Sequence, residues 1–391
     1  VAVVTHFPDD PAAPVDGVEA VSVNLVQALS EFDDVDVDVV TTKQDCPVSR
    51  TDRWGKVNVH RLPWAGGSML RNAVGAGRRQ MQEYLRGLAP DIIHAHDTYG
   101  LMTKGMGVSR VFTIHGFMYG DLLAQGSLSA YMRSWVWRWF ETACWAEQPH
   151  IISISPYVRE RLRKIASGVI HDIDNPVSES FFDIKRNESK GTVFCAAAVI
   201  PRKNQLALVD AVAGLAENGG SVELRLAGPL HAESYVKQVR ERISRTGLKG
   251  KVHLLGCLNA EQIRLELSSA SVFALTSLEE NSPMGIEEAM AAGVPVIASN
   301  RCGMPYMVRD GESGFLVDPN DPEDIARRLK QLLEDDELRR SMGAKSREIA
   351  EQDEKAKKLD ALLSQKKEDL AIQEEELQTS AALQYLSYSM R

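Results

Sequence analysis

Short apolar runs alternate with stretches whose apolar residues recur at helical spacing along most of this chain. The runs are typical of strands buried on both faces, and the stretches between them are typical of helices that cover such a sheet. We predict strands at residues 1–5, 34–40, 57–61, 91–96, 111–114, 151–154, 191–200, 222–227, 252–255, 272–276, 294–298 and 314–317. We predict helices at residues 18–29, 71–88, 131–145, 206–216, 235–246, 260–269, 283–292 and 322–333. This alternation predicts an α/β fold with a doubly wound parallel sheet in each half, as in Rossmann-like domains.

The domain organisation follows from turn residues and from a change in composition. The turn at residues 174–177 is the natural junction between the halves. We expect an N-terminal domain over residues 1–177 and a C-terminal domain over residues 178–350. Residues 351–391 are rich in Glu, Lys and Gln with one narrow apolar stripe, which indicates a polar helical segment and only a weak coiled-coil signal.

Two predicted helices of the first half carry surfaces that allow more than one interpretation. The helix at 131–145 places large apolar side chains at helical spacing, namely Met132, Trp135, Val136, Trp139, Phe140 and Ala143. We interpret this stripe as core rather than as a wedge that faces a membrane. The helix at 71–88 carries four arginines, which we interpret as a solvated face, with contact to an anionic lipid surface or an anionic acceptor as the alternative.

The stretch at residues 278–299 combines a loop, a helix and a buried strand. Ser282 is suited to cap the helix, and Pro283 fits the first helical position. Glu280 precedes the helix and Glu288 lies inside it. Free amides at a helix start bind anions, and carboxylates accept hydrogen bonds from hydroxyls. The stretch therefore suits a ligand that carries both phosphate and sugar hydroxyls.

Other candidate site residues follow the predicted strands. Lys203, with Arg202 beside it, comes after the first strand of the second half, where it could neutralise a phosphate. Gly17 opens the first helix after the first strand. His115 ends a strand and could donate to a phosphate or sugar hydroxyl, or could bond only to the loop backbone. His94 and His96 lack a third ligand nearby, which favours structural or substrate-side roles over a metal site.

The bulk composition limits the classes of function. The net charge of −9 argues against a general nucleic-acid binder. The five cysteines are widely spaced, show no metal-ligand pattern and indicate reduced thiols. Neither a signal peptide nor a long apolar span is visible. We therefore expect a cytoplasmic protein, with peripheral contact at the inner membrane face left open.

The motifs of the second half resemble those of a known enzyme family. The Glu-x7-Glu pair, Glu280 and Glu288, stands within the run at 279–299, and the Ala-Met that follows Glu288 selects this pair over Glu279 and Glu287. Supporting matches lie at residues 91–97, 113–116, 153–155, 175–177, 201–205 and 310–317. The chain resembles the retaining glycosyltransferases of the GT-B fold, in the large family that includes sucrose synthase-like and mannosyltransferase-like enzymes. The resemblance covers residues 1–350 and implies two Rossmann-like domains that face each other across a cleft.

The resemblance also implies a role for each matching residue. Glu288 would hold the ribose hydroxyls of a nucleotide-sugar donor, and Glu280 would hold its sugar. Lys203 and the amides around Pro283, Met284 and Gly285 would hold the diphosphate. The donor-site loop would also include Asn281 and Ser282; His115 would lie near the transferred sugar, Gly17 near the phosphates and Leu258 near the base. The family usually has an arginine where this chain has Ala198, and Arg202 would partly replace it.

The resemblance implies a sugar transfer without a metal ion or a cofactor. A lysine and a helix start stabilise the charge that develops on a leaving diphosphate. Front-face substitution with retention fits this arrangement better than a two-carboxylate scheme. The acceptor would be a glycan, a lipid-linked molecule or a small molecule.

Two other functions remain open from the sequence. One is a nucleotide-sugar epimerase or hydrolase with the same fold. The other is a donor-binding subunit with reduced activity, which Ala198 and the unusual C-terminal segment suggest. A dehydrogenase is disfavoured because no Gly-x-Gly-x-x-Gly follows the first strand.

Overall fold

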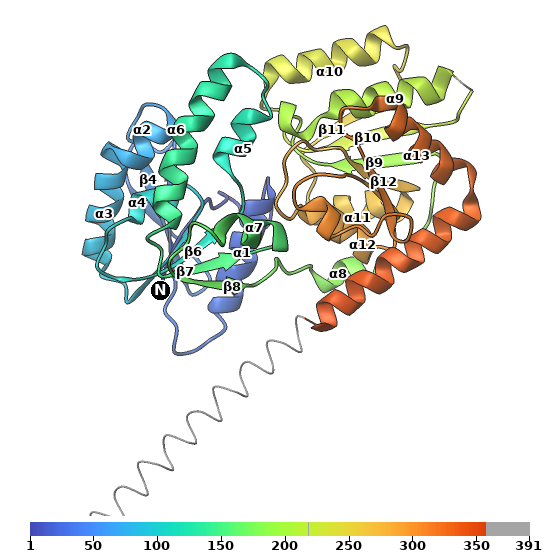
Figure 1. Cartoon of the computed structure of the whole chain (residues 1–391). Coiled ribbons are helices and arrows are strands. Elements are labelled where there is room, and N and C mark those ends of the chain that lie inside the picture. The colour runs from blue at the N-terminus through green and yellow to red at the C-terminus, as the bar shows by residue number, and fades with distance from the viewer. Residues whose placement is uncertain (218, 357–391) are drawn as a thin grey trace, which may run out of the picture. The chain divides into compact units, whose positions relative to one another are not determined.

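The computed structural model describes residues 1–217 and 219–356 (Figure 1). The chain forms two compact units, residues 1–347 and 348–391. In the second unit, residues 348–356 are helical. The prediction of a polar helical segment for the remaining residues, 357–391, lies outside the described part of the chain.

The first unit contains two sheets and the helices that cover them. The strands of the first sheet are β1 (Ala2–Val4), β2 (Asp38–Lys43), β3 (Arg50–Trp54), β4 (Val57–Pro63), β5 (Ile92–His96), β6 (Ser109–Ile114), β7 (His150–Ser153) and β8 (Val169–Asp172). The helices along the same part of the chain are α1 (Gly17–Leu29), α2 (Met69–Val74), α3 (Ala76–Leu88), α4 (Tyr99–Thr103), α5 (Met118–Leu123), α6 (Leu128–Trp145), α7 (Pro156–Leu162) and α8 (Glu179–Phe182).

The second sheet is built from the chain that follows. Its strands are β9 (Thr192–Ala196), β10 (Glu223–Ala227), β11 (Val252–Gly256), β12 (Val272–Leu275), β13 (Val296–Ser299) and β14 (Gly314–Val317). Its helices are α9 (Gln205–Glu217), α10 (Glu233–Arg245), α11 (Ala260–Ser269), α12 (Met284–Ala291) and α13 (Pro322–Glu334), with the short 3₁₀ helices η1 (Pro201–Lys203) and η2 (Met304–Tyr306).

The first sheet has the strand order β3-β4-β2-β1-β5-β6-β7-β8. Its strands pair in parallel, except that β3 pairs antiparallel with β4 at the edge. Consecutive residues of a strand point to opposite faces. Accordingly, Val3 of β1 packs in one core with Val26 of α1, whereas Ala2 and Val4 pack in the other core, with Trp137 of α6. Helices therefore cover both faces, as the alternating pattern predicted.

The second sheet is wholly parallel, in the order β11-β10-β9-β12-β13-β14. Its central strands β9 and β12 are buried, and the rings of Phe194 and Phe273 meet at 6.1 Å between centroids. The predicted class is confirmed, because both halves are doubly wound parallel sheets of the Rossmann type.

The predicted strand at 34–40 and the predicted helix at 71–88 differ from the structure in their bounds or number. The segment at 34–40, in which acidic and apolar residues alternate, was predicted as a strand. Strand β2 begins only at Asp38 and continues to Lys43, because β1 pairs with residues 38–40. The predicted helix at 71–88 is two helices, which separate at Gly75 with φ −111° and ψ −122°. A Cβ atom at Gly75 would lie 2.5 Å from the carbonyl oxygen of Arg71. Strands β3 and β8 were not predicted.

The prediction that the apolar stripe of residues 131–145 is core is wrong. Helix α6 buries its other side, with Ala130, Ser134, Trp137, Glu141, Cys144 and Trp145. Most of the predicted core side chains are exposed, with Met132, Trp135 and Trp139 more than 60% accessible. Large apolar residues occur around most of this helix, so apolar spacing alone did not reveal which side is buried. No helix in the described ranges has the length and apolarity needed to cross a bilayer.

Candidate active site

The strand order of the second sheet brings two separate loops together. From β9 the chain runs outward through β10 and β11, whereas β12, on the other side of β9, leads outward through β13 and β14. The loops that follow β9 and β12 therefore diverge, and such a switch point leaves a crevice at the carboxyl ends of the strands. The Leu278 amide donates to the Arg202 carbonyl at 2.8 Å and joins the two loops. Lys203 and Glu280 thus become neighbours.

A buried charge cluster occupies this point. The Lys203 ammonium donates to Oε1 of Glu280, and Arg202 approaches Oε2 of Glu280 at 3.3 Å. The side chains of Lys203 and Glu280 are only 14% and 8% exposed. Arg202 also donates to the Glu279 carbonyl at 2.8 Å. Both cations that the sequence singled out therefore share one carboxylate.

Burial and pairing act in opposite directions on this cluster. Burial alone would raise the pKa of Glu280, but the nearby charges of Lys203 and Arg202 lower it below its ordinary value. Burial lowers the pKa of Lys203, and Glu280 limits that decrease. The pKa of Arg202 is raised, because Glu280 and Asp121 outweigh the effect of burial. The cluster therefore holds two cations against Glu280 and, from the first half of the chain, Asp121.

Helix α12 begins one residue later than predicted. Pro283 is its N-cap residue, with an extended ψ of 113°, and the helix starts at Met284. The prediction that Ser282 caps the helix is wrong, because Ser282 lies before the extended proline and instead donates to Glu287 Oε1 at 3.2 Å. The first amides of α12, from Met284 and Gly285, have no carbonyl four residues earlier within the helix. They remain suited to an anion.

Gly285 allows α12 to lie close to the sheet. A Cβ atom at Gly285 would lie 3.1 Å from Cζ of Phe273 and 3.3 Å from the carbonyl oxygen of Ala196. A larger residue would move the helix start away from the ends of β9 and β12. Glycine at this position therefore sets the distance between the helix amides and the charge cluster.

Glu288 has an environment unlike that of Glu280. Burial raises its pKa to about 8, and the neighbouring Glu287 adds to the increase. Within the described ranges, no ion pair of Glu288 is found. The two carboxylates of the Glu-x7-Glu motif therefore differ in state: Glu280 is ionised and paired, whereas Glu288 lacks a cation.

His115 follows β6, the neighbour of β5 in the first sheet, whose switch point lies between β1 and β5. Its backbone amide donates to Asp97 Oδ1 at 2.7 Å, and its Nε2 lies 3.0 Å from Nδ1 of His96. Burial lowers the pKa of His115 to about 4, so its ring is neutral at pH 7. His94 is bonded to Thr113 at 2.8 Å, and the described residues contain no group of three metal-ligating side chains.

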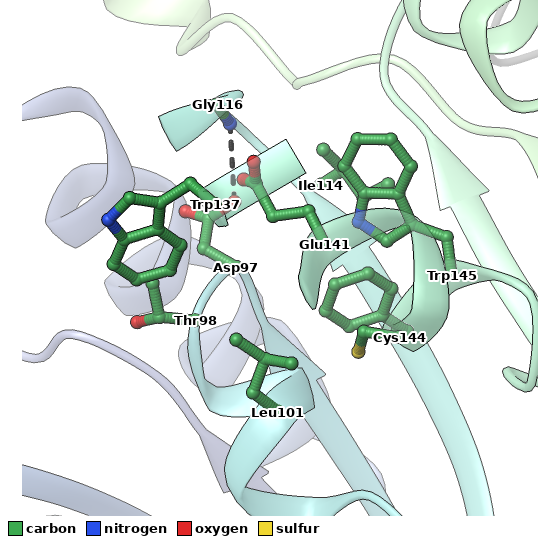
Figure 2. Close-up of a pocket in the computed structure, with 10 residues that line it drawn as sticks. Asp97, Thr98, Leu101, Ile114, Gly116, Trp137, Glu141, Cys144 and Trp145 are labelled. Atoms are coloured by element: carbon green, nitrogen blue, oxygen red, sulfur yellow. Dashed lines mark hydrogen bonds between the residues drawn. The ribbon is translucent and has the colours of Figure 1, made fainter. Parts of the chain in front are cut away.

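Two carboxylates hold the loop that carries His115. Asp97 accepts the amides of His115 and Gly116, and Glu141 accepts those of Met118 and Tyr119 at 2.8 and 3.1 Å. Figure 2 shows both carboxylates pointing toward the loop at Gly116, beside a small cavity that Trp137 and Trp145 also line. We call Asp97 and Glu141 the loop clamp.

The sequence did not predict the loop clamp. Asp97 follows a predicted strand, at the end of the matching stretch 91–97, but its acceptor role depends on a loop 18 residues later. Glu141 lies on a helix that was interpreted only through its apolar residues. The one signal in the sequence was that Glu141 is the single acidic residue within 128–145.

Contacts between the halves involve residues that the sequence did not single out. Asp121 of α5 lies 3.1 Å from Nε of Arg202. The Tyr157 hydroxyl donates to Glu279 at 2.8 Å, and Gly120 is so close that a Cβ there would lie 3.0 Å from Cδ of Glu279. Glu279, the carboxylate passed over in the motif, thus contacts the first half of the chain.

The remaining predicted site residues, Gly17 and Leu258, differ in their position relative to the site. A Cβ at Gly17 would lie 3.8 Å from Cγ of Met284, so the start of α1 faces the start of α12. The Asp16 carboxylate accepts the Glu19 amide at 2.9 Å and thereby caps its own helix. Leu258 follows β11, two strands away from β9, and is half-buried. The structure brings Gly17 to the site region, whereas Leu258 stands at its far side.

Two family models match this chain in succession. Residues 15–181 match "Glycosyltransferase Family 4", and residues 177–349 match "Glycosyl transferases group 1". The chain belongs to this family of retaining glycosyltransferases with the GT-B fold. It is therefore an enzyme that moves a sugar from a nucleotide-sugar donor to an acceptor.

Individual proteins agree with this assignment. An uncharacterized glycosyltransferase of Methanocaldococcus jannaschii is 23% identical over 309 residues, which are 76% of this chain and 81% of the relative. A GDP-mannose-dependent alpha-(1-6)-phosphatidylinositol monomannoside mannosyltransferase of Mycobacterium tuberculosis is 27% identical over 215 residues, 50% of this chain and 55% of the relative. The sucrose-phosphate synthase structure from Thermosynechococcus elongatus has a TM-score of 0.77 at 21% identity, covering 95% of this chain and 99% of that one.

The loop clamp generates a prediction about stability and pH. Burial raises the pKa of Glu141 to about 8, from an ordinary value of 4.5. The folded protein therefore binds a proton that the unfolded chain releases, so this group should stabilise the fold at low pH and lose that contribution as pH rises to about 8. Glu141→Gln should show a weaker fall in melting temperature between these pH values. An equal fall in melting temperature with pH for the variant and the parent would contradict the raised pKa of Glu141.

Proposed function

We propose that this chain transfers a hexose from a nucleoside diphosphate sugar with retention of configuration and without a bound metal ion. In this proposal, residues 1–177 form the acceptor side and residues 178–350 form the donor domain. The observation that carries the proposal is the cluster of Lys203, Arg202 and Glu280 at the switch point beside the first turn of α12.

The leaving diphosphate would use the two cations of this cluster, Lys203 and Arg202. Lys203 and Arg202 are both held on Glu280, so they need little reorganisation to receive an anion. The amides of Met284 and Gly285 add donors from a second direction. Arg202 would supply the guanidinium that the family usually has at the position of Ala198. A bound metal is not required for this charge balance.

Glu280 and Glu288 would take different parts of the donor. Glu288 is partly buried and forms no ion pair within the described residues. Hydrogen bonds from two ribose hydroxyls would stabilise its charged form and lower its pKa from about 8. Glu280 would accept a hydroxyl of the transferred sugar while its other contacts orient Lys203. Asn281 and Ser282 would complete the donor loop, and Leu258 would contact the base.

The reaction would proceed on one face of the sugar. The bond from the anomeric carbon to the leaving phosphate oxygen breaks, and a bond to the acceptor oxygen forms on the same side. The acceptor proton passes to the phosphate oxygen. Glu280 is a poor nucleophile because Lys203 and Arg202 hold its charge, which favours this scheme over a covalent glycosyl-enzyme. Neutral His115 would donate to or accept from a hydroxyl of the sugar, and Gly17 would lie at the phosphates.

The acceptor is proposed as a glycan or a lipid-linked molecule. The relative that uses GDP-mannose acts, by its name, on a phosphatidylinositol monomannoside, which is a lipid. A lipid-linked acceptor would require peripheral contact with a membrane. Two alternatives give different products: an epimerase or hydrolase would yield an altered donor or free sugar without acceptor, and a donor-binding subunit would bind donor without turnover.

A thermal-shift screen of uridine, guanosine and adenosine diphosphate sugars identifies the donor, because a ligand that binds the folded state raises its melting temperature. Product analysis with the active donor then separates transfer from hydrolysis and epimerisation. Free sugar formed at the same rate with and without acceptor would contradict transfer.

Removal of the proposed phosphate and ribose contacts should abolish donor binding. Lys203→Ala should lower kcat/KM by about 100-fold or more, because a preorganised charge is lost, and Glu288→Ala should remove the donor-induced thermal shift. Lys237→Ala is the matched control, because this lysine is 78% exposed and forms only a 3.9 Å pair with Glu241. If both site variants kept the parent's shift, the donor site would lie elsewhere.

Asp121 should weaken donor binding in the parent protein, because it neutralises part of the charge of Arg202 at 3.1 Å. Asp121→Asn keeps the size of the side chain and removes its charge. We expect donor affinity to rise by about two- to fivefold at neutral pH, measured by titration calorimetry. A loss of affinity would show instead that Asp121 positions Arg202.

Metal independence has a direct measurement. Transfer rates should be unchanged after dialysis against EDTA and after subsequent addition of Mg²⁺ or Mn²⁺, because cationic side chains and helix amides balance the diphosphate charge. An activity that disappears with EDTA and returns with either ion would contradict this part of the proposal.

A further inference from the structure

The outward side of α6 carries a continuous line of exposed apolar residues. They recur at intervals of three and four positions and share one side of the helix. We call them the α6 face: Leu128, Tyr131, Met132, Trp135, Val136 and Trp139. Trp135 and Trp139 are 62% and 65% exposed, and Leu128 is 78% exposed. An exposed apolar line of this length marks an interaction surface.

The orientation of this face is fixed by the opposite side of the helix. Trp137, Cys144 and Trp145 of α6 are buried in the core of the first sheet. Helix α5 lies along α6, as Figure 1 shows, and Glu141 of α6 accepts the first amides of α5. The helix cannot rotate its tryptophans inward without breaking these contacts. The α6 face is therefore a built feature of the surface.

The two charged residues within residues 122–140, which include the α6 face, are both arginines. Arg133 and Arg138 are exposed on opposite rims of the apolar line. Residues 122–140 contain these two arginines and neither aspartate nor glutamate. Arg138 also lies over the ring of Tyr119, 5.8 Å from its centroid, which supports its position at the rim. This basic rim contrasts with the net charge of the whole chain, which is −9.

We propose that the α6 face docks on the surface of a bilayer that contains anionic lipids. Tryptophan and tyrosine rings are suited to the boundary between headgroups and acyl chains, and arginines reach from an apolar face to lipid phosphates. The helix would lie in the plane of the interface, with Trp135 and Trp139 inserted and with Arg133 and Arg138 at the headgroups. Attraction of the two arginines to anionic headgroups adds to the apolar contact.

A second copy of the chain fits this surface less well. In a twofold interface the same patch meets itself, so the arginines of one copy would approach those of the other. Residues 122–140 offer no carboxylate to compensate for that repulsion. An anionic lipid surface satisfies both the apolar line and its basic rims.

Docking would also connect the lipid surface to the charge cluster through α6 and α5. Gly120 and Asp121 of α5 face Glu279 and Arg202, and α5 is held at its start by Glu141 of α6. One helix pair thus joins the docking face to the charge cluster. This consequence rests on the proposed function, whereas docking itself requires neither donor nor acceptor.

The test is cosedimentation of the full-length protein with vesicles, without any sugar nucleotide. We expect binding to vesicles that contain about one-third phosphatidylglycerol in phosphatidylcholine, weaker binding to phosphatidylcholine alone, and a decrease when the ionic strength rises from about 0.05 to about 0.5 M. Trp135→Ser with Trp139→Ser should lower the partition coefficient by about tenfold or more. Arg133→Gln with Arg138→Gln should remove the preference for anionic vesicles.

Matched controls separate this face from other surfaces. Phe32→Ser changes an aromatic side chain that is 59% exposed elsewhere and should leave vesicle binding unchanged. Arg79→Gln with Arg86→Gln removes two exposed arginines of α3, the other helix considered for lipid contact, and should also have no effect. Melting temperatures of all variants establish that each is folded.

Three outcomes would overturn the proposal. The first is a parent protein that does not bind anionic vesicles, and the second is equal binding by the Trp135 and Trp139 double variant. The third is a dimer in sedimentation velocity that this double variant converts to a monomer, which would show that a second copy covers the face. Loss of donor binding or transfer would count against the proposed function only, because vesicle binding is measured without them.

Discussion

The interaction on which the site depends is the contact of one buried carboxylate, Glu280, with two cations, Lys203 and Arg202. Separately, each of these charges would be costly to bury. Together they compensate one another, and they keep two cations at the switch point of the second sheet. A nucleotide-sugar transferase needs such a charge where its diphosphate leaves. In the proposed function, the same contact prepares the site for an anion.

The two halves of the chain meet around this cluster. Arg202 faces Asp121, and Glu279, next to Glu280, accepts from Tyr157. Residues of the proposed donor site therefore contact helices of the first half, so occupation of that site would act on the position of α5. The loop clamp of Asp97 and Glu141 fixes the other end of the same region, below His115. The proposed bilayer contact of α6 would act on this framework from outside.

Most of the fold could be predicted from the sequence because strands buried on both faces give apolar runs, and covering helices give the intervening periodic stretches. The edge strand β3, which is largely exposed, gives no such run. The Glu-x7-Glu motif identified Glu280 and Glu288, and the cations after the first strand of the second half identified Lys203 and Arg202. The cap of α12 was misassigned because Ser282 and Pro283 fit the pattern of a helix start, whereas the extended backbone at Pro283 delays it by one residue.

The sequence by itself determined the class of fold and the family and predicted the candidate donor-side residues, because these depend on local periodicity and on motifs within short stretches. Only the tertiary structure decided which side of α6 is buried, since periodicity indicates an apolar line but not what lies against it. It also decided that Lys203 and Arg202 share Glu280, 77 and 78 residues away, and that Asp97 and Glu141 converge on one loop. These arrangements follow from strand order, which brings distant segments together at the ends of parallel strands.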